Sequence, residues 1–196
     1  MKKKLIAEGF GTFALALAVL TSVNVDSVLA TPVIAGLVLG LFVYTIGSNS
    51  GCHINPAVTA GLWSIGKINS KDAMSYIASQ LAGGLVAFFV ASAFIPGLSL
   101  GTDAESMMVF FAELIGMVVF TFGIASVVYK KAEGSASGLI IGGSLMLGII
   151  IAVHLGSAGL LNPAVGLAVG SLSFSYVLGA VAGSAIGMRL FKMIST

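Results

Sequence analysis

The tripeptide Asn-Pro-Ala occurs twice in the sequence, first as Asn55, Pro56 and Ala57 and again as Asn162, Pro163 and Ala164. Asparagine caps helix N-termini because its side-chain oxygen accepts an unpaired backbone N–H, and proline suits the first helical position because it has no N–H. Each motif therefore predicts the start of a helix, with the asparagine NH2 group facing outward. Two such groups can donate hydrogen bonds to a neutral molecule, while the positive ends of two helix dipoles disfavour a cation.

Few other side chains could do chemistry. The good nitrogen or sulfur ligands are Cys52, His53 and His154, which are too few for a closed zinc site, so no metal is expected. An enzyme would need a nucleophile and a base within reach of each other, and His154 has no acidic neighbour in sequence. We therefore expect neither catalysis nor a cofactor. A net charge of +2, without basic stretches rich in aromatics, excludes nucleic acid as a partner.

The elements that position these residues are predicted from composition. Only 8% of the 196 residues are charged and 58% are hydrophobic, whereas soluble domains carry about 25% charged residues. A membrane span needs about 20 apolar residues. Six runs are long enough to span: Leu5 to Thr21, Pro32 to Ser48, Ala73 to Ile95, Ser106 to Tyr129, Ser137 to Leu155 and Phe174 to Ile194. We expect an all-α integral membrane protein in contact with lipid.

The two segments that follow the Asn-Pro-Ala motifs, Asn55 to Ile65 and Asn162 to Ser171, are too short to span and are predicted to be re-entrant half-helices. This topology places every basic residue on one side, and basic residues mark the cytoplasmic face. The charged residues of the opposite loops are all acidic, namely Asp26, Asp103 and Glu105. Both termini are therefore predicted to be cytoplasmic. The first thirty residues also resemble a cleavable leader, but Glu8 interrupts the apolar run, so we interpret them as a retained span.

The chain also repeats itself. Ala7 to Gly11 reads AEGFG and Ala112 to Gly116 reads AELIG, and each is followed by a second span and an Asn-Pro-Ala motif. Because each half contains an odd number of spans, the halves must have opposite orientations. We predict one channel-like domain over 1–196, built from inverted repeats at 1–98 and 104–196. Pairs of glycines four residues apart, such as Gly36 with Gly40 and Gly179 with Gly183, predict closely packed helices.

Together these motifs resemble the aquaporin and glycerol-facilitator superfamily, the major intrinsic proteins. The matching stretches are AEGFGTF at Ala7, GCHINPAVTAGLW at Gly51, KDAMSYIASQLAGG at Lys71, AELIGMVVFTFG at Ala112 and LNPAV at Leu161. The resemblance implies six helices plus two half-helices, a homotetramer with a pore in each subunit, and passive conduction of water and small neutral solutes in the plasma membrane. No cofactor is implied.

The resemblance also implies roles for several residues. Glu8 and Glu113 are expected to support the half-helix loops through backbone hydrogen bonds, the alternative being a proton relay. His53 and Cys52 are expected to line the pore. For His53 the alternatives are a neutral wall residue and a pH-sensitive gate.

One position departs from the family, which usually has arginine directly after the second motif. Here that residue is Val165. Ungapped spacing places the other residues of the outer selectivity filter at Ala35, Gly159 and Ile150, or at His154 in place of Ile150 if the outer loop is shorter. This small, apolar set predicts a wide filter that passes glycerol as well as water. The alternative is altered selectivity, for ammonia, urea or hydrogen peroxide, or an ion leak.

Three further interpretations remain open on sequence grounds. An inverted repeat also occurs in secondary transporters, although the spans offer few buried charges besides Glu8 and Glu113. A membrane-embedded enzyme and a non-conducting member of the same family are the others.

Overall fold

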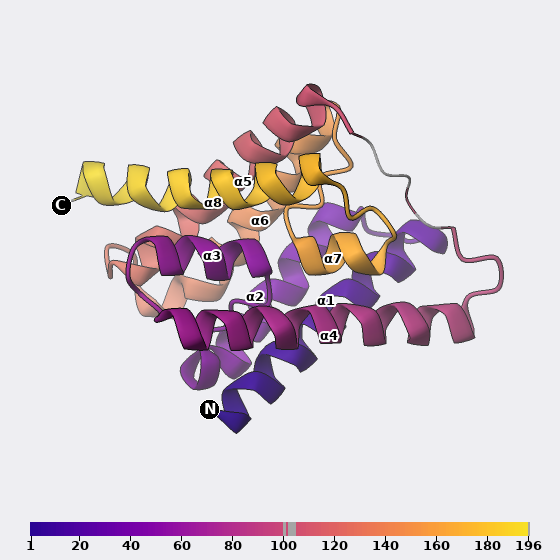
Figure 1. Ribbon diagram of the computed structural model, residues 1–196, viewed down its shortest axis with the longest axis horizontal. Coiled ribbons are helices and arrows are strands. Elements are labelled where there is room, and N and C mark those ends of the chain that lie inside the picture. Colours follow the sequence, from indigo (N-terminus) through magenta and orange to yellow (C-terminus); the bar gives the residue numbers. More distant parts are fainter. Residues whose placement is uncertain (100, 102–104, 196) are drawn as a thin grey trace.

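The computed structural model describes residues 1–99, 101 and 105–195 (Figure 1), and these residues form helices and connecting loops without strands. The elements are α1 (Lys2–Asn24), α2 (Thr31–Ser50), α3 (Pro56–Ser64), α4 (Ser70–Phe94), α5 (Met107–Val128), the 3-10 turn η1 (Gly134–Ala136), α6 (Ser137–His154), α7 (Pro163–Ala168) and α8 (Phe174–Ser195).

Six helices in the described part of the chain are long and apolar enough to cross a membrane. They are α1, α2, α4, α5, α6 and α8, and they coincide with the six predicted runs to within a few residues. The fold class predicted from sequence is confirmed. Two helices extend beyond the predicted apolar run into charged residues, α1 by starting at Lys2 and α4 by starting at Ser70, before Lys71. Long basic side chains can reach the polar membrane interface from a helix end.

The short helices α3 and α7 lie between the long helices α4 and α8 (Figure 1), and each contacts both of them. Around this centre, α1 packs against α4 and α2, while α5 packs against α8 and α6. The half-helix α7 has six residues and ends at Ala168, short of the predicted Ser171. The order of long, long, short and long helices is the same before and after residue 100. The division into inverted repeats at 1–98 and 104–196 stays a prediction, and residues 104 and 196 lie outside the described part of the chain.

Glycines allow the long helices to approach backbone to backbone. A Cβ atom built on Gly83 of α4 would lie 2.2 Å from the carbonyl oxygen of Gly9 in α1, and one on Gly183 of α8 would lie 2.4 Å from that of Leu114 in α5. Between α2 and α6, a Cβ on Gly36 would lie 2.7 Å from the oxygen of Gly142. In lipid no hydrophobic force drives helices together, so close packing of this kind holds the bundle.

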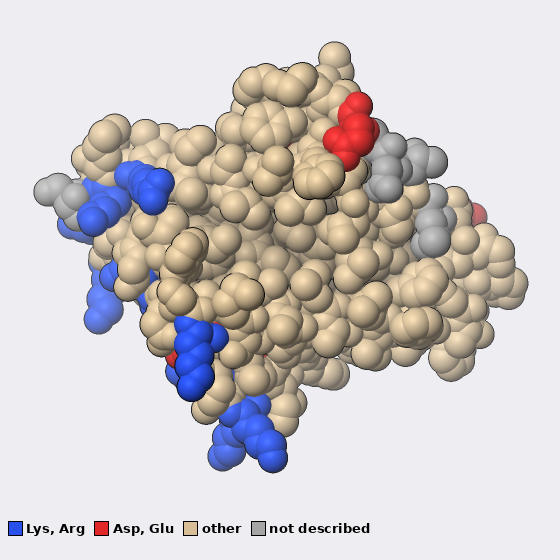
Figure 2. All heavy atoms as spheres, viewed as in Figure 1, with Lys and Arg blue, Asp and Glu red and all other residues tan. Residues whose placement is uncertain are grey.

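The basic side chains visible in Figure 2 gather at the end of the molecule where Figure 1 marks both termini. Most of the acidic side chains visible in that view lie at the other end. This separation agrees with the predicted division of charges between the membrane faces. Of the three acids assigned to the far face, Asp103 lies outside the described residues.

Candidate pore

The two short helices begin at the Asn-Pro-Ala motifs. Asn55 is the N-cap of α3, and its Oδ1 accepts hydrogen bonds from the backbone N–H groups of Ala57 (2.8 Å) and Val58 (3.4 Å). Asn162 caps α7 in the same way through the N–H groups of Ala164 (3.0 Å) and Val165 (3.4 Å). The capping role predicted for both asparagines is confirmed. Because each carbonyl oxygen is bound to its own helix, the amide NH2 group must point away from it.

The NH2 groups also join the two halves. Asn55 Nδ2 donates to the carbonyl oxygen of Leu161 at 2.8 Å, and Asn162 Nδ2 donates to that of Ile54 at 3.0 Å. The sequence analysis has both NH2 groups facing the cavity, and the structure adds that one hydrogen of each group is bound to the opposite loop. An amide nitrogen has two hydrogens, so one N–H of each asparagine has no partner among the described residues.

Two buried carboxylates hold the loops that precede the half-helices. Glu8, which is fully buried, accepts the backbone N–H groups of His53 (3.0 Å) and Ile54 (2.7 Å). Glu113, also fully buried, accepts those of Leu160 (2.9 Å) and Leu161 (2.7 Å). The support role predicted for both acids agrees with these contacts.

These contacts impose an unusual backbone. Ile54 has φ of 38° and Leu161 has φ of 48°, both in the left-handed region that a branched side chain seldom adopts. Such strain persists only where surrounding contacts fix it. Here it turns each carbonyl toward the opposite asparagine, so the carboxylates and the cross-braces form one connected arrangement.

Several supporting side chains were not identified from the sequence. Ser50 donates to Glu8 Oε1 at 2.6 Å, and Ser157 donates to Glu113 Oε1. Gln80 Nε2 donates to Glu8 Oε2 at 2.8 Å. Two signals could have found them. Each serine stands five residues before a motif asparagine, and Gln80 is an uncharged polar side chain inside an apolar span, where polar groups need partners.

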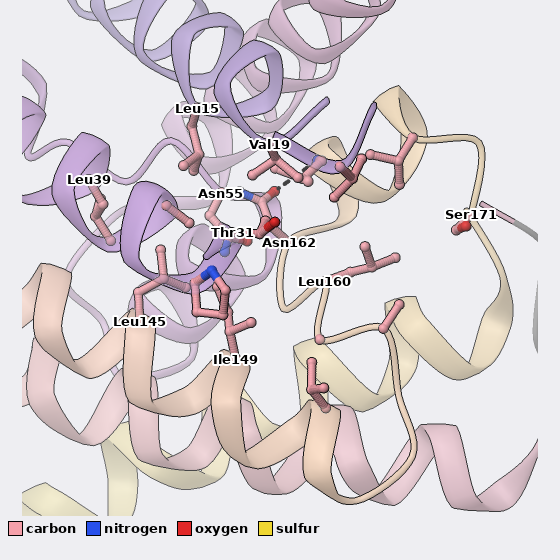
Figure 3. A pocket seen from close by; sticks show the side chains of 18 of the residues that line it. Leu15, Val19, Thr31, Leu39, Asn55, Leu145, Ile149, Leu160, Asn162 and Ser171 are labelled. Carbon is pink, nitrogen blue, oxygen red and sulfur yellow. Dashed lines mark hydrogen bonds between the residues drawn. The ribbon is translucent and has the colours of Figure 1, made fainter. Parts of the chain in front are cut away.

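A cavity of about 470 Å³ opens beside the two asparagines (Figure 3). Its walls are apolar side chains from the long helices, and the asparagine side chains point toward each other from α3 and α7 at its inner part. No Asp, Glu, Lys or Arg of the described residues lines it. Its lining includes Leu15, Val19, Ala35, Leu39, His53, Asn55, Phe120, Leu145, Ile149, Gly159, Leu160, Asn162 and Val165.

Three of the four residues predicted for the outer filter line this cavity, namely Ala35, Gly159 and Val165. On α6 the described lining residues are Leu145, Ile149 and Val153, and neither Ile150 nor His154 is among them. The spacing estimate is one residue out. Since one residue turns an α-helix by about 100°, Ile150 faces away, while Ile149 shares a face with Leu145. His154 is exposed at the end of α6.

A second, smaller cavity of about 210 Å³ lies on the side of the basic residues and includes Lys4, Lys67, Asp72 and Tyr76 in its lining. His53 lines this vestibule and also the larger cavity, so it lies where the two meet. Cys52, predicted to line the pore, is instead buried in the hydrophobic core, and it is not among the described residues lining either cavity. Successive loop residues point in different directions, and here His53 takes the pore side.

The sequence profile of the major intrinsic proteins matches residues 1–191. The chain belongs to the major intrinsic protein family. This membership confirms the resemblance seen in the motifs. It also makes the protein a multi-pass membrane channel of the class that passes water and small solutes, rather than an enzyme.

Among its relatives, "Glycerol uptake facilitator protein-like 6" of Lactiplantibacillus plantarum is 34% identical over 83% of this chain and 80% of its own. "Aquaporin NIP1-1" of Arabidopsis thaliana is 31% identical over 82% of this chain, and the match spans 61% of that relative's length. "Aquaporin AqpM" of Methanothermobacter thermautotrophicus is 30% identical, with coverage of 82% and 74%. The aquaglyceroporin of Plasmodium falciparum, a solved structure, shares the fold with a TM-score of 0.67 at 23% identity, over 98% and 94% of the two chains.

Proposed function

We propose that this major intrinsic protein conducts water together with small neutral solutes of glycerol size, passively and in both directions. The observation that carries the proposal is the larger cavity of about 470 Å³ beside the two asparagines, the outer cavity. Its walls are apolar and no charged residue is among its described lining. Glycerol presents a hydrocarbon edge that suits such walls, and its hydroxyl groups can accept the one free N–H of Asn55 and of Asn162.

Cation exclusion is assigned to the centre of the pore. Without an arginine at Val165, the positive charge at the centre of the pore comes from the partial charges at the N-termini of α3 and α7. These termini and the two asparagines raise the energy of a cation at the point where the half-helices meet.

The direct test is stopped-flow swelling and shrinking of proteoliposomes in sucrose, glycerol and urea gradients, with a proton-sensitive dye in the lumen. We expect water and glycerol flux well above that of empty liposomes and no proton leak. Flux at the empty-liposome level for both solutes would overturn the proposal. Proton leak, or flux of urea without glycerol, would favour the alternative of altered selectivity.

The filter assignment predicts the effect of Val165→Arg. The long cationic side chain should narrow the pore and reduce glycerol flux by about tenfold, which corresponds to about 1.4 kcal/mol of added barrier, with a smaller reduction for water. Val165→Leu is the matched control, since it adds volume without charge. An unchanged ratio of glycerol to water flux in Val165→Arg would contradict the assignment of Ala35, Ile149, Gly159 and Val165 as the filter.

We further propose a homotetramer in the plasma membrane, as the family resemblance implies. Large apolar side chains are exposed along the long helices, for example Leu37 and Leu41 of α2 and Leu139 of α6, and these must face lipid or another subunit. Native mass spectrometry in detergent should give a mass of about four chains, and a monomer alone under conditions that preserve flux would contradict this.

A further inference from the structure

The polar network around Glu8 continues to the pore through side chains that the proposed function does not use. Glu8 accepts four hydrogen bonds, from the hydroxyl of Ser50, the N–H groups of His53 and Ile54, and Gln80 Nε2. A carboxylate accepts about four such bonds, whereas a protonated acid would need an acceptor for its own hydrogen. Both oxygens of Glu8 therefore act as acceptors toward these donors.

Gln80 connects Glu8 to Thr59 through the two hydrogens of its amide NH2 group. Because Gln80 Nε2 faces the carboxylate, its amide cannot be flipped without placing oxygen against oxygen. Its second N–H then donates to Thr59 Oγ1 at 3.0 Å. Two acceptors lie within reach of the Thr59 hydroxyl, the carbonyl oxygen of Asn55 at 3.0 Å and Gln80 Oε1 at 3.3 Å. The shorter contact, to Asn55, is the usual arrangement of a threonine in a helix.

The remaining neighbour of Thr59 Oγ1 is the ring of His53, whose Nδ1 lies 3.1 Å away. With its hydrogen given to Asn55 and one lone pair to Gln80, Thr59 has an acceptor site left for Nδ1–H. The edge of Tyr76 packs against the ring, with centroids 5.0 Å apart, and limits its rotation.

The other ring nitrogen is left to the pore. No hydrogen bond among the described residues involves Nε2 of His53, and this atom is not among the described buried polar atoms without a partner, so water reaches it. His53 lies where the vestibule meets the outer cavity. The second half has no equivalent, because Leu160 stands where His53 does relative to the motif, and Gly166 stands in place of Thr59.

We propose that Thr59 and Gln80 are positioning residues that hold neutral His53 with its proton on Nδ1, so that Nε2 accepts a hydrogen bond from the conducted solute. The inference rests on the proposed function and sharpens it. Asn55 and Asn162 offer donors at the centre and His53 offers an acceptor on the vestibule side, while Leu160 offers neither on the other side. The pore then selects molecules that both donate and accept, such as water and polyols.

The test is ¹⁵N solid-state NMR of histidine-labelled protein in liposomes, which separates protonated from unprotonated ring nitrogens. The chain has two histidines, and His154→Gln, which removes an exposed side chain outside the cavity lining, leaves the signals of His53 alone. We expect protonated Nδ1 and unprotonated Nε2. Thr59→Val should lose this single tautomer, Gln80→Met should weaken it, and Thr59→Ser should restore it.

Flux is measured on the same samples. Loss of one oriented hydrogen bond should reduce glycerol flux in Thr59→Val by roughly fivefold, with recovery in Thr59→Ser. The matched control is Thr121→Val. Thr121 is a buried threonine of α5 whose hydroxyl faces the carbonyl oxygens of Met117 (2.8 Å) and of Ser184 in α8 (3.3 Å), away from His53. This variant should leave both readouts unchanged. A protonated Nε2 in the parent, or the parent spectrum in Thr59→Val, overturns the inference while the channel function stands. A parent without water or glycerol flux overturns both.

Discussion

At the scale of single residues, the pore depends on side chains that bind backbone rather than solute. Glu113 illustrates this, because all its hydrogen bonds go to Ser157 and to the N–H groups of the loop before α7. A buried N–H group without an acceptor destabilises the folded state, and a hydrogen bond to a charged acceptor contributes more stability than one to a neutral acceptor. The carboxylate is thus part of the structure that orients Leu161 and, through it, Asn55.

Glu113→Gln should therefore lower the free energy of unfolding by roughly 1.5–3 kcal/mol, because one oxygen acceptor becomes an NH2 group facing N–H donors. Thermal unfolding in detergent, followed by intrinsic fluorescence or circular dichroism, measures the change. Glu133→Gln is the control, since Glu133 is exposed and makes no side-chain cap bond to η1. Equal stability of the two variants would argue against the support role.

At the scale of elements, a loop residue can fix the start of a long helix by accepting its first N–H groups. Glu105 illustrates this at the start of α8, where its carboxylate accepts the N–H of Phe174 at 2.7 Å and the hydroxyl of Ser175 at 2.9 Å. These hydrogen bonds, the one from Phe174 first, lower the pKa of Glu105 below its usual range. A carboxylate at a helix N-terminus is also favoured by the helix dipole.

Because the pKa of Glu105 is lower in the folded state than in the unfolded chain, its contribution to stability is present above the unfolded value of about 4.3 and is lost as pH falls through the folded value. Glu105→Gln should thus lower the unfolding temperature at neutral pH, and the gap to the parent should close as the pH falls below about 4. Melting curves across pH 3–8 give this gap. A constant gap would contradict the capping role.

The contact between α1 and α4 yields a second prediction at this scale. Gly83→Ala places a methyl group against the backbone of Gly9, and such overpacking should cost about 1–3 kcal/mol. Gly143→Ala in α6 is the matched control, because a Cβ there meets nothing within 4 Å. The control should be neutral or stabilising, by up to about 1 kcal/mol, since alanine is the better helix former. Comparable melting temperatures would show that the close contact does not hold the helices.

At the scale of the whole molecule, the distribution of charge predicts how the chain lies in the membrane. The nine Lys and Arg residues are assigned to one face, and Figure 2 shows those in view gathered at one end. Because cytoplasmic loops are enriched in basic residues, the vestibule beside Lys4 and Lys67 is expected to open to the cytoplasm.

Labelling of single cysteines in intact cells with a membrane-impermeant maleimide tests this orientation. Ser27→Cys, in the α1–α2 loop, should react from outside, whereas Ser135→Cys, in η1, should react only after permeabilisation. Both side chains are exposed, and the native Cys52 is buried, so the unmodified chain serves as the unreactive control. The reverse labelling pattern would show that the chain has the opposite orientation in the membrane.

The features that the sequence determined by itself are those whose physics is local in the chain. Apolar runs of spanning length, the capping of α3 and α7 by Asn55 and Asn162, and the need of Glu8 and Glu113 for backbone donors all follow from neighbouring residues and from the cost of polar groups in lipid. Three features needed the tertiary structure: the cross-braces from the asparagines to Leu161 and Ile54, the face of α6 that presents Ile149, and the chain of hydrogen bonds from Glu8 to His53. Each joins groups from separate elements, and their partners are decided by how the loops turn and how the helices rotate when they pack.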